Sequence, residues 1–151
     1  MLQKPTKLQY FLSAVGIAFS LSANALEFRS IAPAKAILYD APSLEASKLY
    51  ILSQSYPVEL IVNLNNWVKV RDAAGALSWV ESKSLSSKRT VLVLTKTDIK
   101  SAEDPTSALV ATVEKDVVLE MLADRQNGWV KVRHRDGVTG FVQVTNVWGV
   151  N

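Results

Sequence analysis

Two short segments of the chain alternate apolar and polar side chains with a period of two. Residues 68–71 are Val-Lys-Val-Arg, and residues 130–133 are the same four residues. Because successive side chains of a strand point to opposite faces, we predict two β-strands that bury valines and expose lysine and arginine. Short apolar or β-branched segments predict further strands, and helical periodicity fits only weakly at 44–49 and 107–112. These further strand segments are 49–52, 58–64 and 90–94.

Turn residues follow both of the alternating segments. Asp136-Gly137 is a strong signal for a tight hairpin turn, and Ala74-Gly75 is its weaker counterpart. Short strands separated by such turns are typical of small antiparallel barrels or sandwiches. The hydrophobic pattern therefore predicts an all-β chain.

The chain contains an internal repeat. Residues 65–71 (NNWVKVR) and 127–133 (NGWVKVR) are identical at six of seven positions, at an offset of 62. The same register continues through 71–80 and 133–142, where Trp79 aligns with Phe141. Upstream, 57–63 aligns with 118–124 at an offset of 61, and 36–43 aligns with 97–104. We therefore predict two homologous units.

The order of these segments resembles the bacterial SH3-like (SH3b) domain. The resemblance rests on AILYDAPS at 36–43, PVELIV at 57–62, WVKVR at 67–71 and SWV at 78–80, and on NGWVKVR and DGVTGFV in the second copy. The first copy departs from the family by having Ser78 in place of glycine, and the second has Glu103 where the first has Pro42. The resemblance implies two tandem small SH3-like antiparallel β-barrels, each strongly bent and of five or six strands.

The first 25 residues have the pattern of a secretory signal peptide. Lys4 and Lys7 precede an uncharged apolar run at 8–21, and Ala23 and Ala25 form an A-x-A cleavage site. The run of 14 residues is shorter than the roughly 20 that a spanning helix needs. We predict a signal peptide at 1–25, SH3-like domains at 26–88 and 89–151, and export to the periplasm or cell envelope without membrane attachment after cleavage.

Composition excludes most reactive chemistry. The chain has no cysteine and one histidine, which rules out disulfides, thiolate metal sites and cysteine nucleophiles. Removing the two signal lysines changes the balance of basic to acidic residues from 17 against 14 to 15 against 14, so nucleic acid is not an expected partner. We predict no catalytic residues, no metal and no cofactor. His134 is expected to be solvated in its polar turn, as are the acidic residues Asp98, Glu103 and Asp104.

Aromatic side chains next to cationic ones are the candidate binding residues. Trp67 and Trp129 each begin the repeated strand, on the same face as its lysine and arginine. Either tryptophan can line a ligand groove or simply close the end of its barrel. By resemblance to SH3 domains, Tyr39 and Asp40 lie opposite Trp67, which favours the first unit, since the second has Lys100 and Ser101 there. The predicted ligand-binding residues are Tyr39, Asp40, Trp67, Lys69, Trp79 and Trp129.

Two functions fit this pattern. The first is a non-enzymatic exported module that recognises peptidoglycan or an envelope peptide through an aromatic groove, as the resemblance implies. The alternative is a scaffolding protein that docks on another envelope protein. It predicts a large exposed apolar patch or a long uncovered strand edge, for which 91–94 is the candidate. The join at 84–89 is short and polar, so we expect the units to contact each other. Trp148 is expected to seal the second barrel or the seam.

Overall fold

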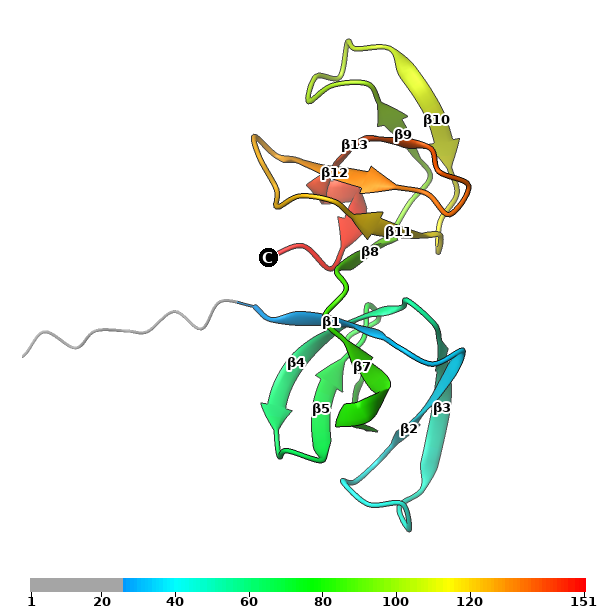
Figure 1. The fold of residues 1–151 in the computed structure, drawn as a ribbon, viewed down its shortest axis with the longest axis vertical. Helices are drawn as coiled ribbons and strands as arrows, with labels where there is room; N and C mark the ends of the chain where they lie inside the picture. The colour runs from blue at the N-terminus through cyan, green and yellow to red at the C-terminus, as the bar shows by residue number, and fades with distance from the viewer. Residues whose placement is uncertain (1–25) are drawn as a thin grey trace, which may run out of the picture.

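The computed structural model describes residues 26–151, and the predicted signal peptide at 1–25 lies outside these described residues. Two β-rich units follow one another along the chain (Figure 1). In residues 26–151 the helical elements are two short 3-10 turns, η1 (Ser82–Ser84) and η2 (Val144–Asn146). The first unit contains β1 (Phe28–Ile31), β2 (Lys35–Tyr39), β3 (Lys48–Ser53), β4 (Pro57–Asn63), β5 (Trp67–Arg71), β6 (Leu77–Glu81) and β7 (Leu85–Ser86). The second contains β8 (Thr90–Val93), β9 (Thr97–Lys100), β10 (Leu109–Val113), β11 (Val118–Met121), β12 (Trp129–Arg133), β13 (Thr139–Gln143) and β14 (Val147–Trp148).

Each unit forms one antiparallel seven-stranded sheet, and the two sheets have the same topology. The strand order is β3-β2-β6-β5-β4-β1-β7 in the first and β10-β9-β13-β12-β11-β8-β14 in the second. The prediction of an all-β chain built from two repeated units is confirmed. The sheets are not closed into barrels, because within residues 26–151 β3 does not pair with β7, nor β10 with β14. The last strands, β7 and β14, have only two residues each, and within residues 26–151 they pair on one side, with β1 and β8.

The repeated strand buries its valines as predicted. Val68 and Val70 are 2% and 1% exposed, and Val130 and Val132 are 1% and 0% exposed. They join two separate cores, one in each unit. Burial of these side chains is the main force that holds each coiled sheet together.

The two predicted hairpin turns are also confirmed. Gly75 and Gly137 have φ angles of 87° and 95°, a left-handed conformation that glycine adopts without strain. In the first turn the N–H of Asp72 donates to the carbonyl four residues later at 3.0 Å, and in the second the N–H of His134 does the same at 2.8 Å. Both hairpins therefore use the same turn geometry. The weak helical patterns at 44–49 and 107–112 instead form a turn followed by a strand in each unit.

One strand expectation is wrong. The segment at 91–94 was the candidate for an uncovered edge, but β8 lies inside the sheet, between β11 and β14. All four of its residues are buried. Its unbroken apolar sequence is the pattern of a strand covered on both faces rather than of an edge.

The units contact each other at the join, as expected. The hydroxyl of Thr90 donates to the carbonyl of Ser55 at 2.7 Å, and the hydroxyl of Ser30 donates to the carbonyl of Lys88 at 2.7 Å. The first bond links β8 of the second unit to the first unit, and the second bond ties the connecting segment to β1.

Aromatic packing adds to this junction. Phe28 of β1 meets Trp148 of β14 edge to face, with ring centroids 5.1 Å apart at 90°. The Arg89 guanidinium lies 5.7 Å from the Phe28 ring centroid and donates to the carbonyl of Gly149 at 2.8 Å. Burial lowers the pKa of Arg89 from its usual value. Trp148 therefore seals the seam between the units, one of the two roles predicted for it.

Candidate binding grooves

The structure brings together the aromatic residues predicted for the first unit. Tyr39 ends β2, Trp67 begins β5 and Trp79 lies on β6, which pairs with both strands. The Tyr39 and Trp67 rings meet edge to face, with centroids 5.3 Å apart at 89°. Tyr39 is directly opposite Trp79 in the β2–β6 pair. These three strands therefore assemble a continuous aromatic surface.

Lys69 and Asp40 flank this surface in different ways. Lys69 is opposite Trp79 across β5 and β6, and its ammonium nitrogen is 5.9 Å from the Trp79 ring centroid. Asp40 is exposed, and its carboxylate accepts the N–H of Ser47 at 3.0 Å. Lys69 thus belongs to the aromatic surface, whereas the Asp40 carboxylate holds the loop between β2 and β3.

The first-unit surface is packed rather than hollow. Tyr39 is only 5% exposed, because its ring is covered where it meets Trp67. Trp67 and Trp79 are half-buried. None of these three side chains lines any of the three cavities of residues 26–151 that are described below. The ring of Tyr39 itself fills the space beside Trp67.

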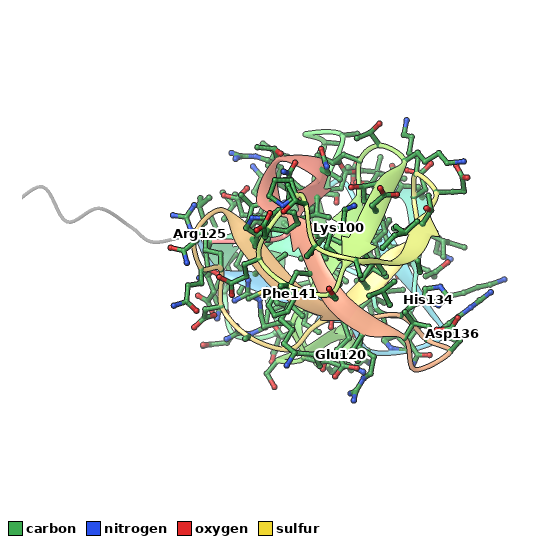
Figure 2. The ribbon with its side chains drawn as sticks, turned by 90° about the horizontal axis from the view of Figure 1, so that it is seen from above. Lys100, Glu120, Arg125, His134, Asp136 and Phe141 are labelled. Atoms are coloured by element: carbon green, nitrogen blue, oxygen red, sulfur yellow. The ribbon has the colours of Figure 1, made fainter. Side chains whose placement is uncertain are left out.

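The second unit has a cavity at the equivalent place. Lys100 takes the position of Tyr39, opposite Phe141 in the β9–β13 pair, and Trp129 takes the position of Trp67. Figure 2 labels Lys100 and Phe141 in the second unit. A cavity of about 390 Å³ opens beside Trp129, which is 7% exposed and forms its apolar wall. The other lining residues are Lys96, Thr97, Asp98, Lys100, Pro105, Thr112, Gln143 and Asn146.

Polar groups surround this second-unit cavity, which we call the Trp129 cavity. The Lys100 ammonium is 3.8 Å from the Asp98 carboxylate, whose other oxygen accepts the hydroxyl of Thr112 at 2.9 Å. Lys96 pairs with Glu114 at 2.6 Å, and this hydrogen bond raises the pKa of Lys96. Ammonium and amide groups around an aromatic wall suit a ligand with a carboxylate and peptide groups.

Sequence reasoning favoured the first unit and missed the lysines and side-chain amides of the Trp129 cavity as binding residues. One signal was present, since the repeat alignment already put Lys100 in place of Tyr39. Lys96 is far from Gln143 and Asn146 along the chain, so the sequence did not indicate that these three residues line one cavity. The missed residues are Lys96, Lys100, Gln143 and Asn146.

The largest of the three cavities, about 840 Å³, lies at the junction of the units and has no Trp, Tyr or Phe in its lining. Two of the cationic residues that line this cavity are paired with Glu120: Arg133 at 2.9 Å and Lys88 at 3.3 Å. The hydrogen bond from Arg133 is the main cause that lowers the pKa of Glu120. This junction cavity is therefore polar, and its charges largely neutralise each other.

The remaining acidic residues serve the loops in which they lie. Asp104 accepts the N–H and the hydroxyl of Thr106 at 2.7 and 2.8 Å, and these bonds lower the pKa of Asp104. Glu103 accepts from the side-chain amide of Asn127 at 3.2 Å. Within residues 26–151, no three His, Asp or Glu side chains gather in a way that could hold a metal ion. No helix in this same range has the length and apolar character to cross a membrane.

Three solved structures are similar to the chain at low identity. NlpC2 from Trichomonas vaginalis is 18% identical with a TM-score of 0.39, over 83% of this chain and 49% of that one. NlpC1 from Trichomonas vaginalis is 20% identical with a TM-score of 0.38, over 96% and 51%. An NlpC/P60 family protein from Bacillus cereus is 13% identical with a TM-score of 0.38, over 80% and 55%. The chain thus spans about half the length of each of these proteins.

A family comparison is more informative. No curated protein matches the chain. The model of the family described as "Bacterial SH3 domain" matches it twice, at residues 32–87 and 101–149. Together the two matches cover well over half of the sequence, one in each structural unit. The resemblance drawn from the sequence is therefore confirmed, and the chain belongs to the bacterial SH3 domain family as a tandem pair.

Proposed function

We propose that this protein is an exported, non-enzymatic binding module that recognises a carboxylate-bearing peptide of the cell envelope, such as a peptide of peptidoglycan. The observation that carries the proposal is the Trp129 cavity, with Lys96 and Lys100 in its lining. Its volume of about 390 Å³ is within the range of small-ligand sites. Membership of the bacterial SH3 domain family supports a binding role.

The chemistry of the cavity favours a peptide end over other ligands. Lys96 and Lys100 offer ammonium groups to a carboxylate, and Gln143 and Asn146 offer amide groups to peptide N–H and C=O groups. Trp129 supplies an apolar face for the backbone or a small side chain. The junction cavity is less suited, since it has no aromatic side chain in its lining.

The other parts of the proposal rest on the sequence. Export rests on the signal-like segment at 1–25. The non-enzymatic character rests on the absence of cysteine and on the single histidine, His134, whose Nδ1 is 2.8 Å from the Asp136 carboxylate. The first-unit surface of Tyr39, Trp67 and Trp79 stays a predicted second contact region for the same ligand.

Co-sedimentation with purified peptidoglycan tests the proposal. Wild-type protein should sediment with it, and a Lys96→Glu/Lys100→Glu variant should bind at least about tenfold more weakly, because both charges that face the ligand carboxylate are reversed. Lys48→Glu, an exposed lysine on β3, is the matched control and should bind like wild type. The Trp67→Ala variant measures how much the first unit contributes to peptidoglycan binding. Wild-type protein that stays in the supernatant, or a double variant that sediments like wild type, contradicts the proposal.

Exposed apolar side chains on the edge strands favour a second candidate, the envelope scaffold. Leu49 and Ile51 on β3 are 47% and 56% exposed, and Leu109 and Val110 on β10 are 58% and 43% exposed. Edge strands with exposed apolar residues are ready sites for pairing with another protein. Crosslinking in cells followed by mass spectrometry separates the two candidates. A single protein partner that is lost in Ile51→Lys supports the scaffold.

A further inference from the structure

The hydroxyl groups of two tyrosines form hydrogen bonds with the β5–β6 hairpin of the first unit. The hydroxyl of Tyr50 donates to the carboxylate of Asp72 at 3.0 Å and lies 3.1 Å from the hydroxyl of Ser78. The hydroxyl of Tyr56 accepts the N–H of Ala73 at 3.3 Å. Both rings pack against the first-unit core. The space beneath this hairpin is therefore filled by the protein's own phenol rings.

The second unit has lost both rings at the same places. Tyr50 is paired with Leu38 in the first unit, and in the second Ala111 is paired with Ile99 in the matching register. The carbonyl of Tyr56 accepts the N–H at the end of β1, and the carbonyl of Val117 accepts the corresponding N–H at the end of β8. Alanine and valine thus stand where the first unit has tyrosines.

A cavity of about 180 Å³ marks the missing volume, and we call it the hairpin pocket. Its apolar lining consists of Ala111 and Val117 together with side chains of the second-unit core and hairpin. The remaining lining residues are Ile99, Thr112, Val113, Glu114, His134, Asp136 and Val138. Apolar cavities of this kind gain free energy when an apolar group enters, because the lining atoms regain contacts that the void denies them.

His134 is one of the four polar residues in the lining of the pocket, with Thr112, Glu114 and Asp136. It occupies the position that Asp72 has in the first unit, and its side chain is 23% exposed. Its Nδ1 bonds to the Asp136 carboxylate at 2.8 Å, which leaves Nε2 as the ring nitrogen for a second hydrogen bond. Figure 2 shows His134 and Asp136 together at the end of this hairpin. The imidazole of His134 can therefore form a hydrogen bond with a phenol hydroxyl, as the Asp72 carboxylate does with Tyr50.

We propose that the hairpin pocket binds the aromatic side chain of a tyrosine presented by a partner peptide. The first unit is the template for this occupant, since Tyr50 fills the equivalent space with a phenol ring. Thr112 lines both the hairpin pocket and the Trp129 cavity, so one peptide on this side of the second unit can reach both. The pocket is otherwise separate, and its occupancy does not depend on the ligand of the Trp129 cavity.

The probe for this proposal is p-cresol, the side chain of tyrosine, titrated into the full chain. The protein has one histidine, so the imidazole protons of His134 give a single NMR reporter signal at the pocket. We expect a saturable shift with a dissociation constant of about 1 mM, which is reasonable for a ligand of this size. Ala111→Tyr supplies the missing ring from the protein itself and should weaken binding at least about tenfold.

Three variants make the test decisive. Ala111→Leu fills the pocket with a smaller side chain and replaces Ala111→Tyr if the latter does not fold. Ala108→Tyr adds a tyrosine at an exposed loop position and should bind p-cresol like wild type. Tyr50→Ala opens the equivalent space in the first unit and should create a second p-cresol site, seen as shifts of the Asp72 and Ser78 amides. Absence of a saturable His134 shift in wild type, or unchanged binding in a folded filled variant, overturns the proposal.

Discussion

Replacing Phe28 by alanine should loosen the seam between the two units. Phe28 is 3% exposed and meets the edge of Trp148 at a centroid distance of 5.1 Å. The Arg89 guanidinium lies over the same ring at 5.7 Å. The Nε of Arg89 is buried without a hydrogen-bond partner among the described residues, and the guanidinium is held by the ring, the carbonyl of Gly149 and the side-chain oxygen of Asn151. One side chain therefore supports contacts to both the linker and the second unit.

The size of the effect follows from these contacts. Deleting a buried phenylalanine ring costs about 3–5 kcal/mol of unfolding free energy. Of this, the edge-to-face pair accounts for about 0.5–1.5 kcal/mol and the cation–π contact for about 0.5–1 kcal/mol. Since a domain is typically stable by about 5–15 kcal/mol, Phe28→Ala removes a large share of the first unit's stability.

Urea unfolding and calorimetry check this prediction. We expect Phe28→Ala to lower the urea midpoint and to split the thermal transition, because the second unit keeps its own core. A double-mutant cycle with Trp148→Ala should give a coupling of about 1 kcal/mol. Phe28→Leu, which keeps apolar volume but removes the ring, is the control and should lose the coupling with a smaller total cost. Effects of Phe28→Ala and Trp148→Ala that add within about 0.3 kcal/mol would refute the reasoning.

Three further predictions concern single side chains. Asp72→Ala should destabilise the first unit by about 2 kcal/mol in urea unfolding, since the buried carboxylate accepts two hairpin N–H groups at 3.0 and 2.9 Å as well as the Tyr50 hydroxyl. Gly140→Ala should cost about 1–3 kcal/mol by the same assay, because its Cβ would lie 2.5 Å from both Ile99 Cγ2 and the carbonyl of Lys100. Glu120→Gln should destabilise by about 1 kcal/mol at pH 7, because Arg133 lowers the pKa of Glu120 in the folded state. The carboxylate therefore stabilises the fold above the ordinary glutamate pKa, and the difference from wild type should vanish as the pH falls through the lowered value. A Glu120→Gln difference that persists in acid would contradict that assignment.

The features that the sequence predicted well depend on residues that are close together along the chain. Alternation in WVKVR fixes which side chains face the core, whatever the rest of the sheet does. The two hairpin turns need a left-handed residue, and glycine occupies that place at Gly75 and Gly137. The repeat then doubles each local signal, so the all-β architecture and the two units could be inferred from one chain.

Strand order depends on non-local pairing, and there the sequence was less informative. The prediction of an edge at 91–94 is wrong, and the unbroken apolar run of this segment is typical of a strand that is covered on both faces. The open sheet edges at β3 and β10 could not be predicted either. Whether a coiled sheet closes depends on the length of the last strand, and the two-residue strands β7 and β14 carry almost no pattern.

Only part of the candidate site could be predicted from the sequence, and its shape could not. The alignment of the copies placed Tyr39 beside Trp67 and Lys100 beside Trp129, and the structure confirms both placements. Whether such a pair leaves a cavity is a matter of packing. The Tyr39 ring fills the first-unit space to 5% exposure, whereas the lysine of the second unit leaves about 390 Å³ open.

The two copies differ in a consistent direction. At the positions that form the core and the hairpin turns they keep the same residue types, since valines and glycines there maintain the sheet. At the positions above the core, the first copy has Tyr39 and Tyr50 where the second has Lys100 and Ala111. Each exchange replaces an aromatic ring by a side chain that leaves space, and each coincides with a cavity in the second unit. Because unfilled space forfeits packing contacts, these two exchanges support the binding role that we propose for the second unit. The second unit therefore has the two cavities for which we propose ligands, whereas the first unit fills the equivalent spaces with its own rings.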